Sequence, residues 1–259
     1  MLRIQVMHHP EWLVWCFSIT VWLFFALGGM HVLHISPLSE TNLFSATVSS
    51  LWPWGIMVIA MMFPLLNEPV RHVAFSVSSS RRRSTIMIFL LGYTTFWLLI
   101  GSVMISAYTY YQFYYKDLIS VVFVGAMVFL LAGALIWTSG RRKLLTACSI
   151  SIPIQFNSRK TYTDALAYGW IMGKACFKTC WAPMLALVLC HHDLWLMSLV
   201  TIGMLLERYK LPHKSTKISY YWVVIGLALT ILTWQNMNEA YGTSGMTFCG
   251  YDVEWKLNE

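Results

Sequence analysis

The sequence predicts an all-α, polytopic transmembrane helical bundle with about seven spans. Of its 259 residues, 58% are hydrophobic and 11% are charged, whereas a typical soluble domain has about 25% charged residues. The thirteen Trp, thirteen Tyr and fourteen Phe suit a bilayer, where aromatic rings collect at the interfaces. The net charge of +7 comes from short segments between apolar runs. It therefore indicates topology and contact with the lipid bilayer, and we expect no nucleic acid partner.

The apolar runs define the expected elements. A transmembrane helix needs roughly 20 apolar residues, and the candidate segments are residues 12–32, 48–66, 86–108, 118–137, 168–189, 194–206 and 218–234. The first run is too long for the apolar part of a cleaved signal, and no small-residue cleavage site follows it. The sixth run is short, which fits either a tilted span or a re-entrant segment. We expect a single integral membrane domain over residues 1–259.

The basic residues orient this bundle. With seven spans, most of the eighteen Lys and Arg fall on one side: Arg3, Arg71, Arg81, Arg82, Arg83, Arg141, Arg142, Lys143, Arg159, Lys160, Arg208, Lys210, Lys214 and Lys217. The opposite side has only Lys116 and Lys256. Basic loops stay cytoplasmic, so we expect a multi-pass protein of the cell inner (cytoplasmic) membrane. Its N-terminus would be cytoplasmic and its C-terminus external.

The fifth segment carries a stripe of sulfur. Cys176 and Cys180 are four residues apart and share one helix face, which Met172 and Met184 extend in both directions. Thiolate and thioether are soft ligands that suit Cu(I). The alternative interpretation is ordinary packing, since Cys and Met also fill helical cores.

The second segment offers partners for these thiols. Met57 and Met61 are four residues apart, Met62 adds another thioether, and Pro64 deprives the Ala60 carbonyl of its helical partner. The second and fifth segments cross in opposite directions, so Met61 and Met62 are expected at the depth of Cys176. Here too, plain apolar packing is the alternative.

Lys174 and Lys178 also lie in the fifth segment, and intramembrane charges are commonly functional. Beside the cysteines they would favour thiolate, but they would repel a metal cation. Alternatively Lys174 extends toward the inner surface and Lys178 pairs with Glu207 or Glu68.

A second candidate metal site is the external turn formed by Cys190, His191, His192 and Asp193. A thiol, two imidazoles and a carboxylate can hold zinc or copper. His31 and His34 would add imidazoles from the outer end of the first span. No phosphate-binding loop, dinucleotide fingerprint, zinc-protease motif or nucleophile elbow is present, so we expect no enzyme.

Two motifs together resemble those of a bacterial family of predicted metal-binding integral membrane proteins, often labelled copper chaperones. Trp54-x-x-Met57-x-x-Ala60-Met61-Met62-x-Pro64 is similar to the first, and Cys176-x-x-x-Cys180-Trp181-x-x-Met184 is similar to the second. The pair Glu207-Arg208 resembles a Glu-Lys pair of that family. The chain would be a divergent member, because Lys178 stands where the family has Gly and Thr179 where it has its middle Cys.

The resemblance and the residues together favour Cu(I) binding or delivery at a Cys/Met site between the second and fifth helices, with a copper ion as cargo. Met57, Met184 and Glu207 would form its surroundings, and a copper-accepting protein would be the partner. The alternative is an accessory or assembly subunit of a larger copper- or haem-containing membrane complex, with a degenerate metal site. A small-solute transporter is a third hypothesis, although the inverted repeat common in transporters is absent.

Overall fold

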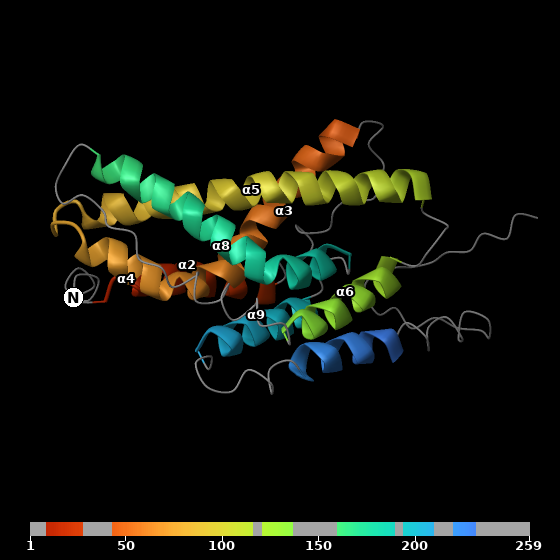
Figure 1. Cartoon of the computed structure of the whole chain (residues 1–259). Helices are drawn as coiled ribbons and strands as arrows, with labels where there is room; N and C mark the ends of the chain where they lie inside the picture. The colour runs from red at the N-terminus through yellow and green to blue at the C-terminus, as the bar shows by residue number, and fades with distance from the viewer. Residues whose placement is uncertain are drawn as a thin grey trace, which may run out of the picture.

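The computed structural model describes residues 9–27, 43–115, 121–136, 160–189, 194–209 and 220–231. Within these ranges the regular structure is entirely helical, which confirms the predicted all-α class. The elements, drawn in Figure 1, are α2 (Trp12–Ala26), α3 (Leu43–Met62), the 3-10 turn η2 (Phe63–Leu66), α4 (Asn67–Phe75), α5 (Arg82–Tyr115), α6 (Val121–Ile136), α8 (Thr161–Leu189), α9 (Leu194–Tyr209) and a further helix, Tyr220–Ile231.

Three helical stretches of the described chain are long and apolar enough to cross a membrane: Thr47–Phe75, Arg82–Tyr110 and Thr161–Leu189. They contain the second, third and fifth predicted spans. The shorter apolar helices Trp12–Ala26, Val124–Ala134 and Tyr220–Ile231 overlap the first, fourth and seventh. The count of seven spans and the orientation of the termini stay predictions.

The second predicted span continues past residue 66, where the sequence had suggested an end. Pro64 is the second residue of the turn η2, its missing N–H leaves the Ala60 carbonyl without a helical partner, and the chain continues into α4 as far as Phe75. The carbonyl of Ala60 is satisfied from α2: Ser18 Oγ donates to it at 2.6 Å and Trp22 Nε1 at 3.2 Å. Helix α2 thus supplies hydrogen-bond donors to the backbone carbonyl that Pro64 leaves without a helical partner.

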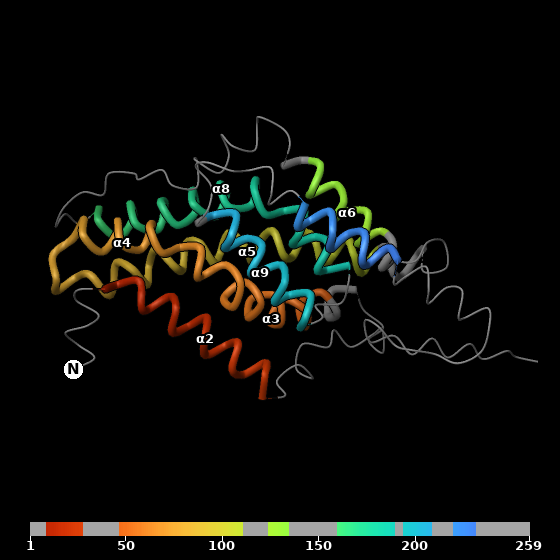
Figure 2. The backbone as a smooth tube through the Cα atoms, turned by 90° about the horizontal axis from the view of Figure 1, so that it is seen from below, coloured from red at the N-terminus to blue at the C-terminus, as the bar shows by residue number. Residues whose placement is uncertain are grey.

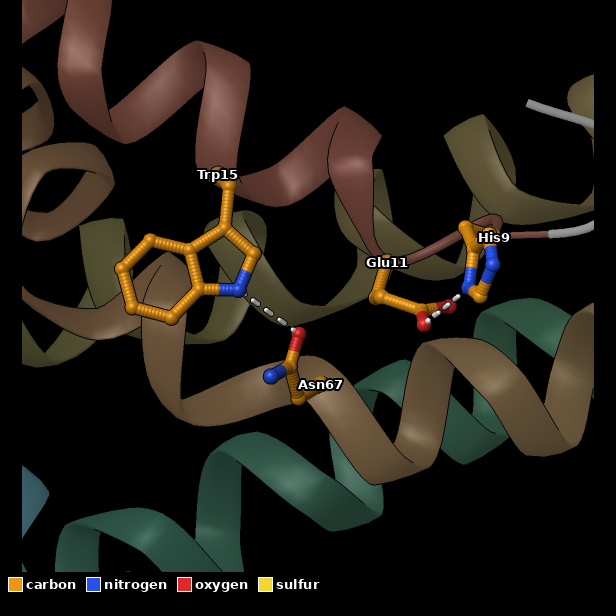
Figure 3. A network of polar contacts seen from close by, with 4 residues as sticks. All are labelled: His9, Glu11, Trp15 and Asn67. Atoms are coloured by element: carbon orange, nitrogen blue, oxygen red, sulfur yellow. Dashed lines mark hydrogen bonds and ion pairs between the residues drawn. The ribbon is translucent and has the colours of Figure 1, made fainter. Parts of the chain in front are cut away.

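A second contact fastens the start of α2 to the start of α4 (Figure 3). Trp15 Nε1 donates to Asn67 Oδ1 at 3.1 Å, across 52 residues of sequence. Just before α2, His9 Nδ1 lies 3.2 Å from Glu11 Oε1. These contacts fix α2 at both the start of α4 and the proline turn.

Helices α5 and α8 form the most extensive pair of the bundle and run side by side in the same direction (Figures 1 and 2). Glycines allow their backbones to approach. A Cβ added at Gly169 would lie 2.1 Å from the Phe89 carbonyl oxygen, and one added at Gly92 would lie 2.4 Å from the Leu166 carbonyl oxygen. Gly173 likewise faces the Phe96 side chain at 2.8 Å. Small residues at such spacing let membrane helices pack closely without a hydrophobic driving force.

The remaining helices enclose this pair. The stretch from α3 to α4 runs antiparallel to α5, because Trp54 of α3 meets residues 97 and 101 whereas Ala74 of α4 meets Arg82. Helix α9 packs against α3, η2 and α8, and α6 packs along α8. The turn between α4 and α5 and the start of α8 lie at one end of the bundle in both views, and α9 runs toward that end (Figures 1 and 2). These are ends that the charge pattern assigns to a common side.

The contact at Gly169 makes a stability prediction. Gly169→Ala should lower the free energy of unfolding in detergent by about 1–3 kcal/mol, because the new methyl group overlaps a backbone carbonyl that cannot move aside. Gly55→Ala is the matched control, since its Cβ would meet only Leu98 Cδ2 at an ordinary 3.4 Å. Thermal unfolding of both variants should show the loss only at Gly169. Equal melting temperatures for the two would contradict close backbone packing of α5 and α8.

Candidate metal centre

Cys176 and Cys180 lie on the buried face of α8, with 5% and 8% of their surface exposed. Met172 and Met184 lie on the same face and are also buried, and α8 continues through Pro183 to Leu189. Both thiols are free in the sense that neither forms a disulfide. The expected sulfur stripe therefore points into the bundle.

Tyr93 of α5 is the residue that sequence reasoning missed. Its hydroxyl donates to Cys176 Sγ at 3.3 Å, and its side chain is fully buried. A donor fixed at a thiol sulfur orients the sulfur and its lone pairs. No local motif marks Tyr93, because its relation to Cys176 arises from the register that the glycines set between α5 and α8.

Thr179 and Cys180 extend this polar cluster. Thr179 Oγ1 donates to the Cys176 carbonyl at 2.8 Å and lies 3.4 Å from Cys180 Sγ. Thr179 is buried as well, so its hydroxyl contacts the thiol of Cys180 and the backbone carbonyl of Cys176.

Helix α3 reaches the same part of α5 from another side. Trp54 Nε1 donates to the Trp97 carbonyl at 2.9 Å, and the two rings lie 6.3 Å apart. Trp97 also meets Phe177, which follows Cys176, at a ring distance of 6.2 Å. The thioethers of this helix, Met57, Met61 and Met62, are completely buried. Helices α3 and α8 therefore both contact α5 at Trp97, through Trp54 and Phe177 respectively.

Helix α9 packs against α3, η2 and α8. Glu207 is buried, with 3% of its surface exposed, and lies within electrostatic range of Cys180. Met204, one turn earlier, and Met197 are buried on the same stripe of α9. Sequence reasoning included Glu207 but missed these two thioethers. The spacing Met197, Met204 and Glu207, which repeats on one helix face, is the signal that would have found them.

Lys174 and Lys178 do not join the cluster. Both are exposed, on the face of α8 opposite the buried thiols. In the described part of the chain neither makes an ion pair, so the suggested pairing of Lys178 with Glu207 or Glu68 is not found. Their ammonium groups therefore point away from the two thiols that would bind a cation.

The external turn of Cys190, His191, His192 and Asp193 lies outside the described residues, as do His31 and His34. Among the residues that the structure describes, no three His, Cys, Asp or Glu side chains gather as a metal site would require. The donor set that the described residues place together on α8 is thus two thiols with the thioethers of Met172 and Met184 on the same face. This set suits Cu(I), and it is poor for zinc, which takes four thiolate, imidazole or carboxylate ligands in structural sites.

The fold and the site define a helical bundle with a buried, sulfur-rich interior. The model of the PpoB2 family, described as copper chaperone, matches residues 51–234, and the chain belongs to this family. The matched range includes Cys176, Cys180 and all the buried methionines described above. No curated protein and no solved structure matches the chain.

Proposed function

We propose that this chain is a non-enzymatic integral membrane protein that binds Cu(I) and delivers it to a copper-accepting protein. Cys176 and Cys180 are the primary ligands. Thioethers of α3, with Met61 and Met62 foremost, complete the coordination, and Met57, Met184 and Glu207 form the surroundings. The observation that carries the proposal is the pair of thiols, one helical turn apart, on a buried face where Tyr93 donates to one of them.

The chemistry of the interior supports a soft, monovalent cargo. Two thiolates with thioether neighbours bind Cu(I) well, and transfer needs only the stepwise exchange of one sulfur ligand for another, with no change of oxidation state. Burial of the thiols keeps water and oxidants away from them. The carboxylate of Glu207 adds negative charge near Cys180, which favours a cation in this space.

The membrane setting rests on the three helical stretches with sufficient length and apolarity and on the charge asymmetry of the predicted loops. We place the protein in the inner (cytoplasmic) membrane with multiple spans. The external turn around Cys190 would then be a second, separate docking point for copper.

A second candidate function is an accessory or assembly subunit of a larger copper- or haem-containing membrane complex. The observation that favours it is the exposed pair Lys174 and Lys178 on an otherwise apolar helix face. Both functions are compatible with membership of the copper chaperone family.

The test of the copper site is elemental analysis of the detergent-purified protein. The wild type should contain close to one copper ion per chain, and Cys176→Ser combined with Cys180→Ser should abolish it because both primary ligands are lost. Cys16→Ser is the matched control, since Cys16 is an exposed thiol on α2 and should leave copper unchanged. Undiminished copper in the double variant would remove the site from α8.

The role of the thioethers is tested by Met61→Leu combined with Met62→Leu, which keeps the side-chain volume. The dissociation constant for Cu(I), measured by competition with a chromogenic chelator, should rise about tenfold or more, equivalent to roughly 1.4 kcal/mol or more. Met87→Leu, at an exposed methionine of α5, should leave it unchanged. An unaltered constant in the double variant would show that α3 contributes packing only.

Tyr93→Phe tests the hydrogen bond at Cys176. Loss of a group that orients a metal ligand typically weakens binding about 10–100-fold, and we expect a shift in this range in the same competition assay. The sulfur-to-copper absorption bands should also change, which loss of packing alone would not produce. Tyr110→Phe, at an exposed tyrosine of the same helix, is the control. Identical spectra and affinity would mean that the hydroxyl has no part in positioning the thiol.

A further inference from the structure

We propose that the exposed face of α8 around Lys174 and Lys178 docks a transmembrane helix of a partner protein that carries Asp or Glu at the same depth in the bilayer. This lysine face consists of Trp170, Ile171, Lys174 and Lys178. The proposal goes beyond copper binding, and it rests only on the membrane-spanning part of the proposed function.

Lys178 lies deep in the predicted fifth span. The predicted span 168–189 places Lys178 at its middle, about ten residues or roughly 15 Å from the inner end of the span. A shift of the span toward the start of α8 is opposed by the polar turn Thr161–Asp164. Lys174, one turn closer to the inner surface, can extend its charge toward the headgroups, because helical side chains point back toward the N-terminus. Lys178 is too deep for its four-carbon stem to reach them.

The side chains of Lys174 and Lys178 are on the outer face of α8. They project from the bundle, while the opposite face of α8 packs on α5, α6 and α9. Their neighbours on the face are apolar: Trp170 and Ile171 have 40% and 46% of their surface exposed. A lipid-facing ammonium at this depth is costly, and intramembrane charges in proteins almost always face protein or water and pair with a partner. We therefore expect a compensating negative charge beside the lysine face.

The predicted spans of the chain contain no carboxylate that could supply that charge. All eleven acidic residues fall outside the seven predicted spans: Glu11, Glu40, Glu68, Asp117, Asp164, Asp193, Glu207, Glu239, Asp252, Glu254 and Glu259. The acid closest in depth is Glu207, and it is buried on the thiol side of α8. Charge complementarity therefore points to a carboxylate on another molecule.

A second copy of the chain is a poor occupant. Two copies that met through this face would bring four ammonium groups together in a medium of low dielectric constant, where like charges repel strongly. A foreign helix with acidic residues four positions apart matches both lysines, because its carboxylates would repeat at the same one-turn spacing. Trp170 and Ile171 would then pack against its apolar side chains.

The test uses the full chain in the membranes of its own host. A photo-reactive residue at Ile171, on the lysine face, should give a discrete protein adduct, whereas one at Leu99, exposed on α5, should not. The adduct should map to a membrane segment with Asp or Glu. Lys174→Met combined with Lys178→Met should reduce it about tenfold, and the corresponding double replacement by Arg should retain it.

Copper content of the same preparations separates this inference from the proposed function. The double Met variant should keep its copper, and the Cys176→Ser, Cys180→Ser variant should keep the adduct. The docking surface would be refuted by adducts with lipid alone, with this chain or a second copy of it, or with a segment that lacks a carboxylate. An adduct that persists unchanged in the double Met variant would refute it as well.

Discussion

The close approach of α5 and α8 is the constraint on which the site depends. At Gly92 and Gly169 the two backbones come so near that a single methyl group would overlap a carbonyl oxygen of the other helix. This approach fixes both the spacing and the register of the pair. It thereby places the Tyr93 hydroxyl at the sulfur of Cys176. A longer separation would leave the hydroxyl of a buried tyrosine without this partner, which is unfavourable in an apolar interior.

The interior of the bundle contains both a helix interruption at Pro64 and the buried sulfur side chains. Pro64 interrupts the ladder of the α3–α4 stretch, and α2 compensates with two donors at the Ala60 carbonyl. Hydrogen bonds in the interior are thus satisfied from neighbouring helices, as a bilayer setting demands. Glu207 is buried on α9, and the buried faces of α3, α8 and α9 carry thiols and thioethers among other apolar side chains. These groups are apolar enough to be buried without metal and soft enough to bind Cu(I).

Much of this could be predicted from the sequence. Composition and the apolar runs predict helices, and the spacing of Cys176 and Cys180 predicts their common face. Helical periodicity also separates Lys178 from the thiols, since a step of two residues turns it roughly 200° from each of them. The contact between Tyr93 and Cys176 could not be predicted, because it spans 83 positions and follows from tertiary packing. The continuation through Pro64 into α4 was missed because it depends on donors from α2.

The coordination of copper in the purified protein is the most direct test of a sulfur site in the interior. X-ray absorption at the copper edge should show Cu(I) with a shell of sulfur neighbours only, because the proposed ligands Cys176, Cys180, Met61 and Met62 are all buried sulfur side chains. A shell that contains nitrogen from imidazole would contradict the account. It would point instead to imidazole ligands such as His191 and His192 of the predicted external turn.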